Sequence, residues 1–302
     1  MDPTGRPEPH ALRRWAPFYF FLAVWTVAAP LVAADFRVAG SDLLAPALPE
    51  ALAVFARQED TPVQPDLRGT RPAVEELRAG RADLGLLLLP PGESPPAGFM
   101  SHIIGYQPAV LVVPESLPLR QVTTAQLRGI FGAEGNVTRW ADAGVTGEYA
   151  PRLVRLLALS PRAGLALPLF RHVVLRDGEL RAGIELCASH DELLARLRAS
   201  DNGIGLTVAF PAAVAAKVRV LALADPERGT VVVPTAETLH DGSYPLRLPL
   251  VAVYRRADAA RLLPLLKFLL GGEGAAALER AGLVPLPAAE RARLGFTLEQ
   301  LQ

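Results

Sequence analysis

From residue 35 onward, short apolar runs alternate along the chain with segments whose apolar residues repeat at helical spacing. The run Phe36–Ala39 predicts a strand, and a Gly-Ser-Asp turn leads from it into a predicted helix over Leu44–Arg57. In that helix the leucines at every fourth position and Phe55 share one face, which a helix buries against a core. Strands that alternate with helices in this way are typical of an α/β fold.

The same pattern predicts the remaining elements. Strands are expected at Pro62–Leu67, Asp83–Leu89, Ile103–Val113, Leu153–Leu159, Gly203–Thr207, Val218–Ala222 and Leu248–Tyr254. Helices are expected at Ala73–Ala79, Thr123–Ile130, a segment ending near Arg171, Asp191–Ala199, Ala257–Leu270 and Gly274–Ala281. Thr70, Ser189 and either Thr123 or Thr124 are the expected N-caps, because hydroxyl side chains accept hydrogen bonds from the first free N–H groups of a helix.

The first 34 residues differ in composition from the rest. Three arginines precede an apolar run from Ala16 to Val32, and small residues follow up to Ala34. A basic start, an apolar middle and small residues before the cleavage point are the parts of a secretory signal peptide. We therefore expect residues 1–34 to be a signal peptide and the mature protein to be periplasmic. An uncleaved membrane anchor is the alternative, since the run approaches the roughly 18–20 residues that span a bilayer.

The charge balance limits the classes of partner that the chain is expected to bind. Of the 302 residues, 31 are lysine or arginine and 31 are aspartate or glutamate, with no long run of one sign. Such a balance creates no net field that attracts nucleic acid or an anionic lipid surface, so no nucleic acid is expected as a partner. Cys187 is the only cysteine, so no intrachain disulfide can form.

The sequence offers no constellation for catalysis or metal binding. The histidines beyond residue 34 lack ligand-like spacing to one another. Cys187 and His190 lie three residues apart, but a buried cysteine that packs as a small apolar residue is the commoner case. Neither a Gly-x-Ser-x-Gly elbow nor a Gly-rich Walker loop with lysine is present. We therefore expect no enzymatic activity, no catalytic residue, no metal and no cofactor.

Four blocks of the sequence, in the same order, resemble the phosphate-type family of periplasmic substrate-binding proteins. They are Arg120–Trp140, Asp201–Leu206, Tyr244–Leu250 and Lys267–Pro287, the last with its Gly-x-x-Pro-Leu ending. The resemblance implies an α/β, two-lobed periplasmic binding protein fold of type II, with two crossover strands and a ligand cleft between the lobes. Lobe one is then residues 35–107 and 248–302, and lobe two is residues 108–247. We expect a monomer that binds a small anion such as phosphate and works with an inner-membrane ABC permease.

In this family the anion lies against helix N-termini, where free N–H groups and the helix dipole favour negative charge. The first matching turn here is Gly40–Leu44. Its candidate donors are the Ser41 hydroxyl and the N–H groups of Leu43 and Leu44, beside Asp42. The alternative is that Ser41 or Asp42 only caps the following helix.

The second matching turn is Gly69-Thr70-Arg71, which stands at the family's Gly-Ser step. Thr70 offers a hydroxyl and an N–H, and Arg71 adds a charge that the family does not need there. The alternatives are a helix cap for Thr70 and a solvated surface cation for Arg71.

Two further places depart from the family pattern. Beyond Asp83 the family has a serine and an acidic residue that accepts the phosphate proton, whereas this chain has Leu86–Leu88. At the last turn, Gly164–Ala166 stand where the family has Ser-Gly-Thr, and Ser160 stands at the family's arginine. Arg162 is a candidate replacement donor to the ligand, or else an exposed loop charge.

The loss of an arginine, two hydroxyls and a carboxylate is expected to weaken phosphate binding by several orders of magnitude, because each hydrogen bond to a charged ligand contributes about 1.5–3 kcal/mol. The leading interpretation is a solute binder that has diverged from tight phosphate binding. Its candidate ligand-binding residues are Ser41, Asp42, Leu43, Thr70, Arg71, Ser160, Arg162 and Gly164. The alternative is a protein-interaction module on the same scaffold with little or no small-molecule ligand. An apolar run Leu86–Leu89 facing the cleft would favour that alternative, although the run also fits a buried strand.

Overall fold

The computed structural model describes residues 35–90, 92–209 and 216–300. The expected signal peptide, residues 1–34, lies outside the described residues. Over the described ranges, every helix is too short or too polar to traverse a bilayer. Strands and helices alternate as expected, so the predicted mixed α/β fold is confirmed.

The larger of the two main sheets has six strands, in the order β14–β4–β13–β3–β1–β2. Their bounds, in chain order, are β1 Phe36–Gly40, β2 Val63–Asp66, β3 Leu84–Leu88, β4 Met100–Pro108, β13 Arg247–Tyr254 and β14 Val284–Pro285. β1 pairs in parallel with β2 and β3, whereas β13 runs antiparallel to β3 and β4. The carboxyl ends of β1, β2 and β3 therefore meet at one edge of this sheet.

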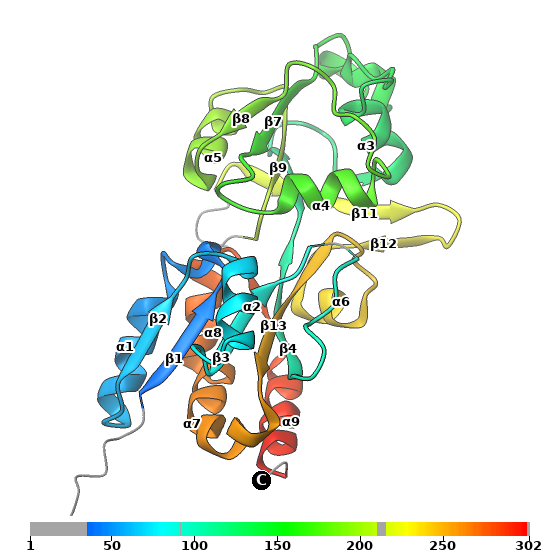
Figure 1. Ribbon diagram of the computed structural model, residues 1–302. Helices are drawn as coiled ribbons and strands as arrows, with labels where there is room; N and C mark the ends of the chain where they lie inside the picture. The colour runs from blue at the N-terminus through cyan, green and yellow to red at the C-terminus, as the bar shows by residue number, and fades with distance from the viewer. Residues whose placement is uncertain (1–34, 91, 210–215, 301–302) are drawn as a thin grey trace, which may run out of the picture. The chain divides into compact units, whose positions relative to one another are not determined.

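Helices pack on both faces of the six-stranded sheet (Figure 1). The bounds of these helices are α1 Leu48–Gln58, α2 Thr70–Arg78, α7 Ala259–Leu270, α8 Gly272–Arg280 and α9 Ala288–Glu299, the last of which packs on α7. Leu86 and Leu88 share a buried cluster with α1, α7 and α8, while Leu87 and Leu89 share another with α2. Alternate residues of a strand point to opposite faces, and both faces are covered here. The hypothesis that Leu86–Leu89 faces a cleft is therefore wrong, and the run is a buried strand.

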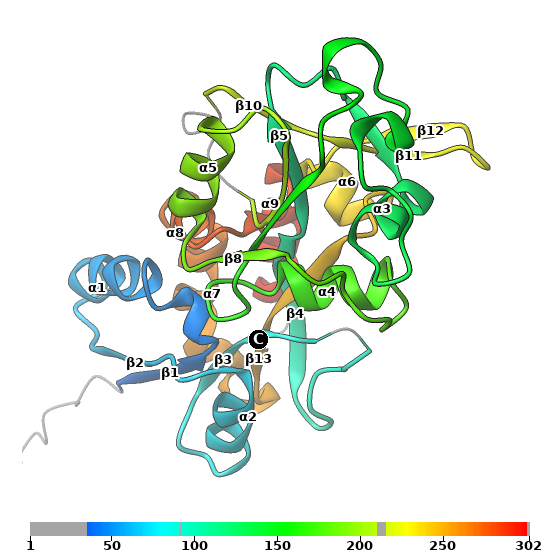
Figure 2. The ribbon, with the colours of Figure 1, turned by 90° about the horizontal axis from the view of Figure 1, so that it is seen from above.

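The second main sheet has five strands, in the order β10–β5–β9–β7–β8. Their bounds are β5 Val110–Pro114, β7 Arg155–Leu159, β8 Glu185–Cys187, β9 Gly203–Thr207 and β10 Val218–Val220. β7 pairs in parallel with β8 and β9, so these three strands also share a carboxyl edge. Figure 2 shows α5, His190–Arg198, beside this sheet, with β8 at its edge.

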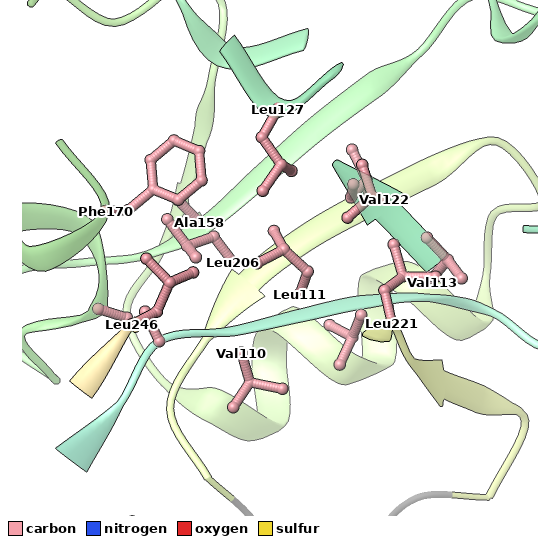
Figure 3. Close-up of a cluster of buried hydrophobic side chains, with 14 of the residues drawn as sticks. Val110, Leu111, Val113, Val122, Leu127, Ala158, Phe170, Leu206, Leu221 and Leu246 are labelled. Atoms are coloured by element: carbon pink, nitrogen blue, oxygen red, sulfur yellow. The ribbon is translucent and has the colours of Figure 1, made fainter. Parts of the chain in front are cut away.

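One large apolar cluster forms the core around the five-stranded sheet. Figure 3 shows Phe170 of α4, Ala166–Val173, and Leu127 of α3, Thr124–Phe131, directed toward the strand residues Leu111 and Leu206. A small third sheet in the order β12–β11–β6 adjoins this region, with bounds β6 Gln121–Thr123, β11 Ala222–Asp225 and β12 Thr230–Val232. The helix α6, Ala236–Asp241, follows it, and 3₁₀ turns occur at Asp42–Leu44, Trp140–Ala143, Gly147–Tyr149 and Arg256–Asp258.

Two predicted strands each prove to be two strands. The expected strand Ile103–Val113 divides at Ala109 into β4 and β5, which belong to different sheets. The Ala109 N–H donates to Leu246 O (2.9 Å), and its carbonyl accepts from Tyr244 Oη (2.8 Å). The expected strand Val218–Ala222 likewise divides into β10 and β11. An apolar run predicts a buried segment, but it does not indicate where the segment changes its partner strand.

The helix expected over Leu44–Arg57 begins later than predicted. Residues Asp42–Leu44 form a single 3₁₀ turn, and α1 starts at Leu48. Pro46 and Pro49 have no N–H with which to make hydrogen bonds inside a helix, so a regular helix can start only where Pro49 lies in its first turn.

Two of the predicted helix N-caps are confirmed and one is wrong. Thr123 caps α3 and forms a capping box with Gln126, and Ser189 caps α5, so both predictions are confirmed. Thr70 does not cap α2: the cap residue is Gly69, and Thr70 is the first residue of the helix. Gly69 has φ +128°, a conformation that side-chain-bearing residues rarely adopt.

Candidate ligand-binding site

Ser41 and Thr70 meet at the carboxyl edge of the six-stranded sheet. The Ser41 N–H donates to Leu86 O (3.0 Å), and the Gly69 N–H donates to Gly40 O (2.9 Å). The Thr70 hydroxyl donates to Leu88 O (3.0 Å). The turns after β1 and β2 are thus both attached to the main chain at the ends of neighbouring strands, which places the first two predicted turns side by side.

Ser41 is 3% exposed, and the groups around it bond mainly to one another. Its hydroxyl oxygen accepts from the Leu43 N–H (3.4 Å), and its carbonyl accepts from the Leu44 N–H (3.1 Å). Both N–H groups that the sequence assigns to the ligand are therefore directed at Ser41. Ser41 caps the 3₁₀ turn, and Asp42 is exposed on that turn.

The start of α2 presents free main-chain donors. Within the described residues, the N–H groups of Thr70 and Arg71 have no acceptor, as expected for the first turn of a helix. Pro72 occupies the next position and has no N–H, so α2 offers two donors rather than three. The Arg71 side chain is exposed and forms no ion pair with any described residue.

The turn after β7 lies at the carboxyl edge of the five-stranded sheet. The Ser160 N–H donates to Cys187 O (2.9 Å), and the Ser160 carbonyl accepts from Ala163 N (2.8 Å). The Ser160 hydroxyl oxygen lies 3.4 Å from the Arg162 N, which leaves its hydrogen available to donate. Arg162 is exposed, and its guanidinium has no partner among the described residues.

Gly164 is buried at the entrance to α4. A Cβ on this residue would lie 2.8 Å from Val208 Cγ1 and 2.9 Å from Leu159 Cδ2, closer than real Cβ atoms approach. Glycine is therefore required by packing at a position where the related family has serine.

The start of α4 resembles the start of α2 in its free main-chain donors. Leu165 is the cap residue and provides no side-chain acceptor. The N–H groups of Ala166 and Leu167 have no acceptor within the described residues, and Pro168 again removes the third donor. Each of the two helices thus offers two main-chain N–H groups at a sheet edge.

Sequence reasoning missed two buried polar side chains near these turns. Gln107, on β4, is 1% exposed, and its Oε1 accepts from the Leu165 N–H (2.9 Å). Thr207, at the end of β9, is fully buried, and its Oγ1 lies 2.8 Å from His190 Nδ1. The one signal was for Thr207, which is a lone polar residue in an apolar strand and therefore needs a partner.

Comparison with known proteins places this chain in a family. A family model described as a PBP superfamily domain matches residues 26–273. The chain belongs to the PBP superfamily. The phosphate-binding protein PstS of Pseudomonas aeruginosa is 27% identical to it in an alignment of 278 positions, which covers 85% of this chain and 84% of that protein. The family resemblance of the four sequence blocks is confirmed.

Solved structures agree with the fold of this PBP superfamily chain. A possible phosphate binding protein from Planctomyces limnophilus superposes with a TM-score of 0.67 at 18% identity, over 89% of this chain and 99% of that one. An ABC-type phosphate transport receptor from Vibrio cholerae gives 0.63 at 16% identity, over 83% and 100%. The predicted two-lobed periplasmic binding protein fold is thereby confirmed.

The buried carboxylate of Asp83 lies away from the free donors of α2. Burial alone raises the pKa of Asp83, but hydrogen bonds from Arg37 and Arg261 outweigh it and lower that pKa to about 2. Asp83 precedes β3, so it lies at the opposite end of the strand from the Ser41 edge. Burial lowers the pKa of His190 below its usual range, which favours the neutral ring beside Thr207.

The described residues contain no group of three histidine, cysteine, aspartate or glutamate side chains that could hold a metal ion. The hydrogen-bond donors that remain available at the two edges among the described residues are main-chain N–H groups, one hydroxyl and two exposed guanidiniums. Such a set is suited to holding a small anion through hydrogen bonds.

Proposed function

We propose that the chain is an exported, non-enzymatic solute binder of the substrate-binding-protein type, which takes a small oxyanion and passes it to an ABC permease. One observation carries the proposal: α2 and α4 each begin at a carboxyl sheet edge with two N–H groups that have no acceptor among the described residues. Helix N-termini of this kind attract anions. The relatives named as phosphate-binding proteins support the same ligand class.

We propose that the donors are the N–H groups at the start of both helices, the Ser160 hydroxyl, and the side chains of Arg71 and Arg162. The Ser41 hydroxyl donates to Asp42 Oδ1 (3.5 Å) and the Thr70 hydroxyl to Leu88 O, so both are engaged within the protein. Leu86–Leu88 provides no carboxylate for a phosphate proton. Affinity for phosphate is accordingly lower than in a site with a full set of charged and hydroxyl partners, and discrimination between oxyanions is weaker.

The division into lobes belongs to the same proposal. Residues 35–107 and 248–302 supply lobe one, and residues 108–247 supply lobe two, with residues 1–34 as the signal peptide. The six-stranded and five-stranded sheets support this division, since each takes its strands almost wholly from one of the two sets.

Calorimetric titration of the purified protein with phosphate, and then with sulfate, tests the proposal. We expect binding weaker than micromolar, with similar affinity for the two anions. Arg71→Gln and Arg162→Gln are expected to weaken it about tenfold or more, because each removes a charged donor. Arg78→Gln, an exposed arginine in the last turn of α2, is the matched control and should leave binding unchanged. Phosphate binding with the arginine variants unaffected would reject the assigned donors.

A protein-interaction module remains the second candidate, favoured by one observation. The Leu165 side chain packs against the core clusters of both main sheets, so the turn before α4 is already in contact with each. No heat with either anion, from a sample that unfolds cooperatively, would favour this second function.

A further inference from the structure

Gln107 and Leu165 form a hydrogen bond between the two main sheets. Gln107 lies on β4 of the six-stranded sheet, and Leu165 leads into α4, which packs on the five-stranded sheet. The residues are 58 positions apart in the chain, and the Gln107 Oε1 to Leu165 N distance is 2.9 Å. Gln107 is 1% exposed, so this is a buried contact rather than a surface one.

The N–H that Gln107 binds belongs to the same turn that, in the proposed function, binds the anion. Leu165 is the cap residue of α4, immediately before the free N–H groups of Ala166 and Leu167. Gly164 is wedged against Val208 and Leu159 on one side of it, and the Leu165 side chain contacts both core clusters. The turn is therefore held in place from several directions, with its N–H directed at a side chain of the protein itself.

An amide oxygen is a suitable internal acceptor at this position. It satisfies an N–H that would otherwise be unpaired in a buried place, and it adds no net charge. An oxyanion oxygen would make the same bond with greater strength, because charged acceptors bind N–H groups more tightly than neutral ones. The two acceptors cannot both occupy the one N–H in good geometry.

We infer that Gln107 is the internal occupant of the anion-binding turn: its side-chain oxygen stands where a ligand oxygen would bind the Leu165 N–H, and this sets a low affinity for anions. The inference rests on the proposed function. Gln107 thereby acts as a specificity-determining residue, since a ligand must displace a neutral amide before it can use the full set of donors.

Two substitutions act in opposite directions. Gln107→Ala removes the acceptor and frees the N–H, so phosphate and sulfate affinity should rise about tenfold or more, the effect of one hydrogen bond to a charged ligand. Gln107→Glu keeps an acceptor of the same shape but adds a negative charge, so the affinity for sulfate, which has no proton to donate, should fall below that of the unaltered protein.

Hydrogen exchange at the Leu165 amide provides a measurement that needs no ligand. In the unaltered protein this amide should exchange slowly, and in Gln107→Ala it should exchange at least about tenfold faster. Gln126→Ala is the matched control, because the Gln126 amide also bonds a distant main-chain group, Ala143 O, at 2.9 Å. It should leave both the Leu165 exchange rate and the anion affinity unchanged.

The outcomes separate the two proposals. Unchanged exchange at Leu165 in Gln107→Ala overturns the inference, whatever the anions do. If the unaltered protein binds phosphate, an equal phosphate affinity in Gln107→Ala also overturns the inference. Faster exchange with tighter binding supports both proposals. Faster exchange with no binding in either protein supports the internal contact and rejects the anion-binding function.

Discussion

Arg37 holds Asp83 through two side-chain hydrogen bonds, from Nη2 to Oδ1 at 2.8 Å and from Nε to Oδ2 at 3.1 Å. The Arg37 main-chain N–H also donates to Oδ2 (2.9 Å), and Arg261 Nη2 lies 2.9 Å from Oδ1. Burial opposes the charge on Asp83, yet these four contacts hold the pKa of its carboxyl at about 2. The pair fixes the start of β3 to β1 and to α7.

This pair predicts a pH-dependent stability. A carboxyl whose folded pKa lies below its unfolded value stabilises the fold above the unfolded pKa, and the contribution is lost as pH falls through the folded pKa. Asp83→Asn should therefore lower the free energy of unfolding at pH 7 by about 2 kcal/mol, and by clearly less at pH 3. Urea unfolding at both pH values measures this. Asp60→Asn, at an exposed turn, is the control, and an equal Asp83→Asn effect at both pH values would contradict the assignment.

Gly164→Ala is predicted to destabilise the protein. The added methyl group lies within 3 Å of Val208 and Leu159, so the buried neighbours must move, at a cost of about 1–3 kcal/mol. Gly295→Ala is the matched control: it lies in α9 with open space around its Cβ position. There alanine should stabilise by about 0.5–1 kcal/mol, because it favours the helix. Thermal unfolding of both variants tests the prediction. A stabilised Gly164→Ala would show that Val208 and Leu159 do not restrict the Cβ position.

The two adjacent threonines at the start of α3 have different roles, because only Thr123 is the N-cap. Thr123 Oγ1 accepts from the Gln126 N–H (3.1 Å), and Gln126 Oε1 accepts from the Thr123 N–H (2.9 Å). Thr123→Ala should lower the free energy of unfolding by about 1 kcal/mol. Thr124→Ala, one residue further on at the first helical position, should change it by less than about 0.5 kcal/mol. Chemical unfolding of the two variants side by side tests the assignment, which fails if their effects are equal.

Thr70→Val tests what the Thr70 hydroxyl does. Valine keeps the shape but leaves Leu88 O without this donor, so stability should fall by about 1 kcal/mol. Thr70→Ser retains the hydroxyl and serves as the control. Anion affinity should change little in Thr70→Val, because the proposed donor is the main-chain N–H. A large loss of affinity with unchanged stability would instead give the hydroxyl to the ligand.

Features that depend on neighbouring residues were predictable from the sequence. The Thr123 and Ser189 caps rest on positions three residues apart, and β1, β3 and β9 are short apolar runs bounded by turns. The delayed start of α1 was also encoded locally, by two prolines, but the helical spacing of the leucines masked it.

Features that depend on distant residues were not predictable. Nothing near Gln107 in the sequence indicates that its acceptor role is directed to Leu165, and nothing near Thr70 indicates Leu88. The division at Ala109 was not predicted because apolar residues lie on both sides of it, Ile103 and Ile104 on β4 and Val110–Val113 on β5. Candidate ligand residues could be named from their turns, but whether a hydroxyl is free or already bonded is decided by strands elsewhere in the chain.

Ala109 has a mechanical consequence. The chain first passes from the six-stranded to the five-stranded sheet at this residue, and its N–H and carbonyl are bonded to Leu246 and Tyr244, just before the chain returns to the six-stranded sheet as β13. The outgoing and the returning crossing are thus tied to each other, so a change of angle between the two sheets that keeps both bonds must move the two segments as one unit.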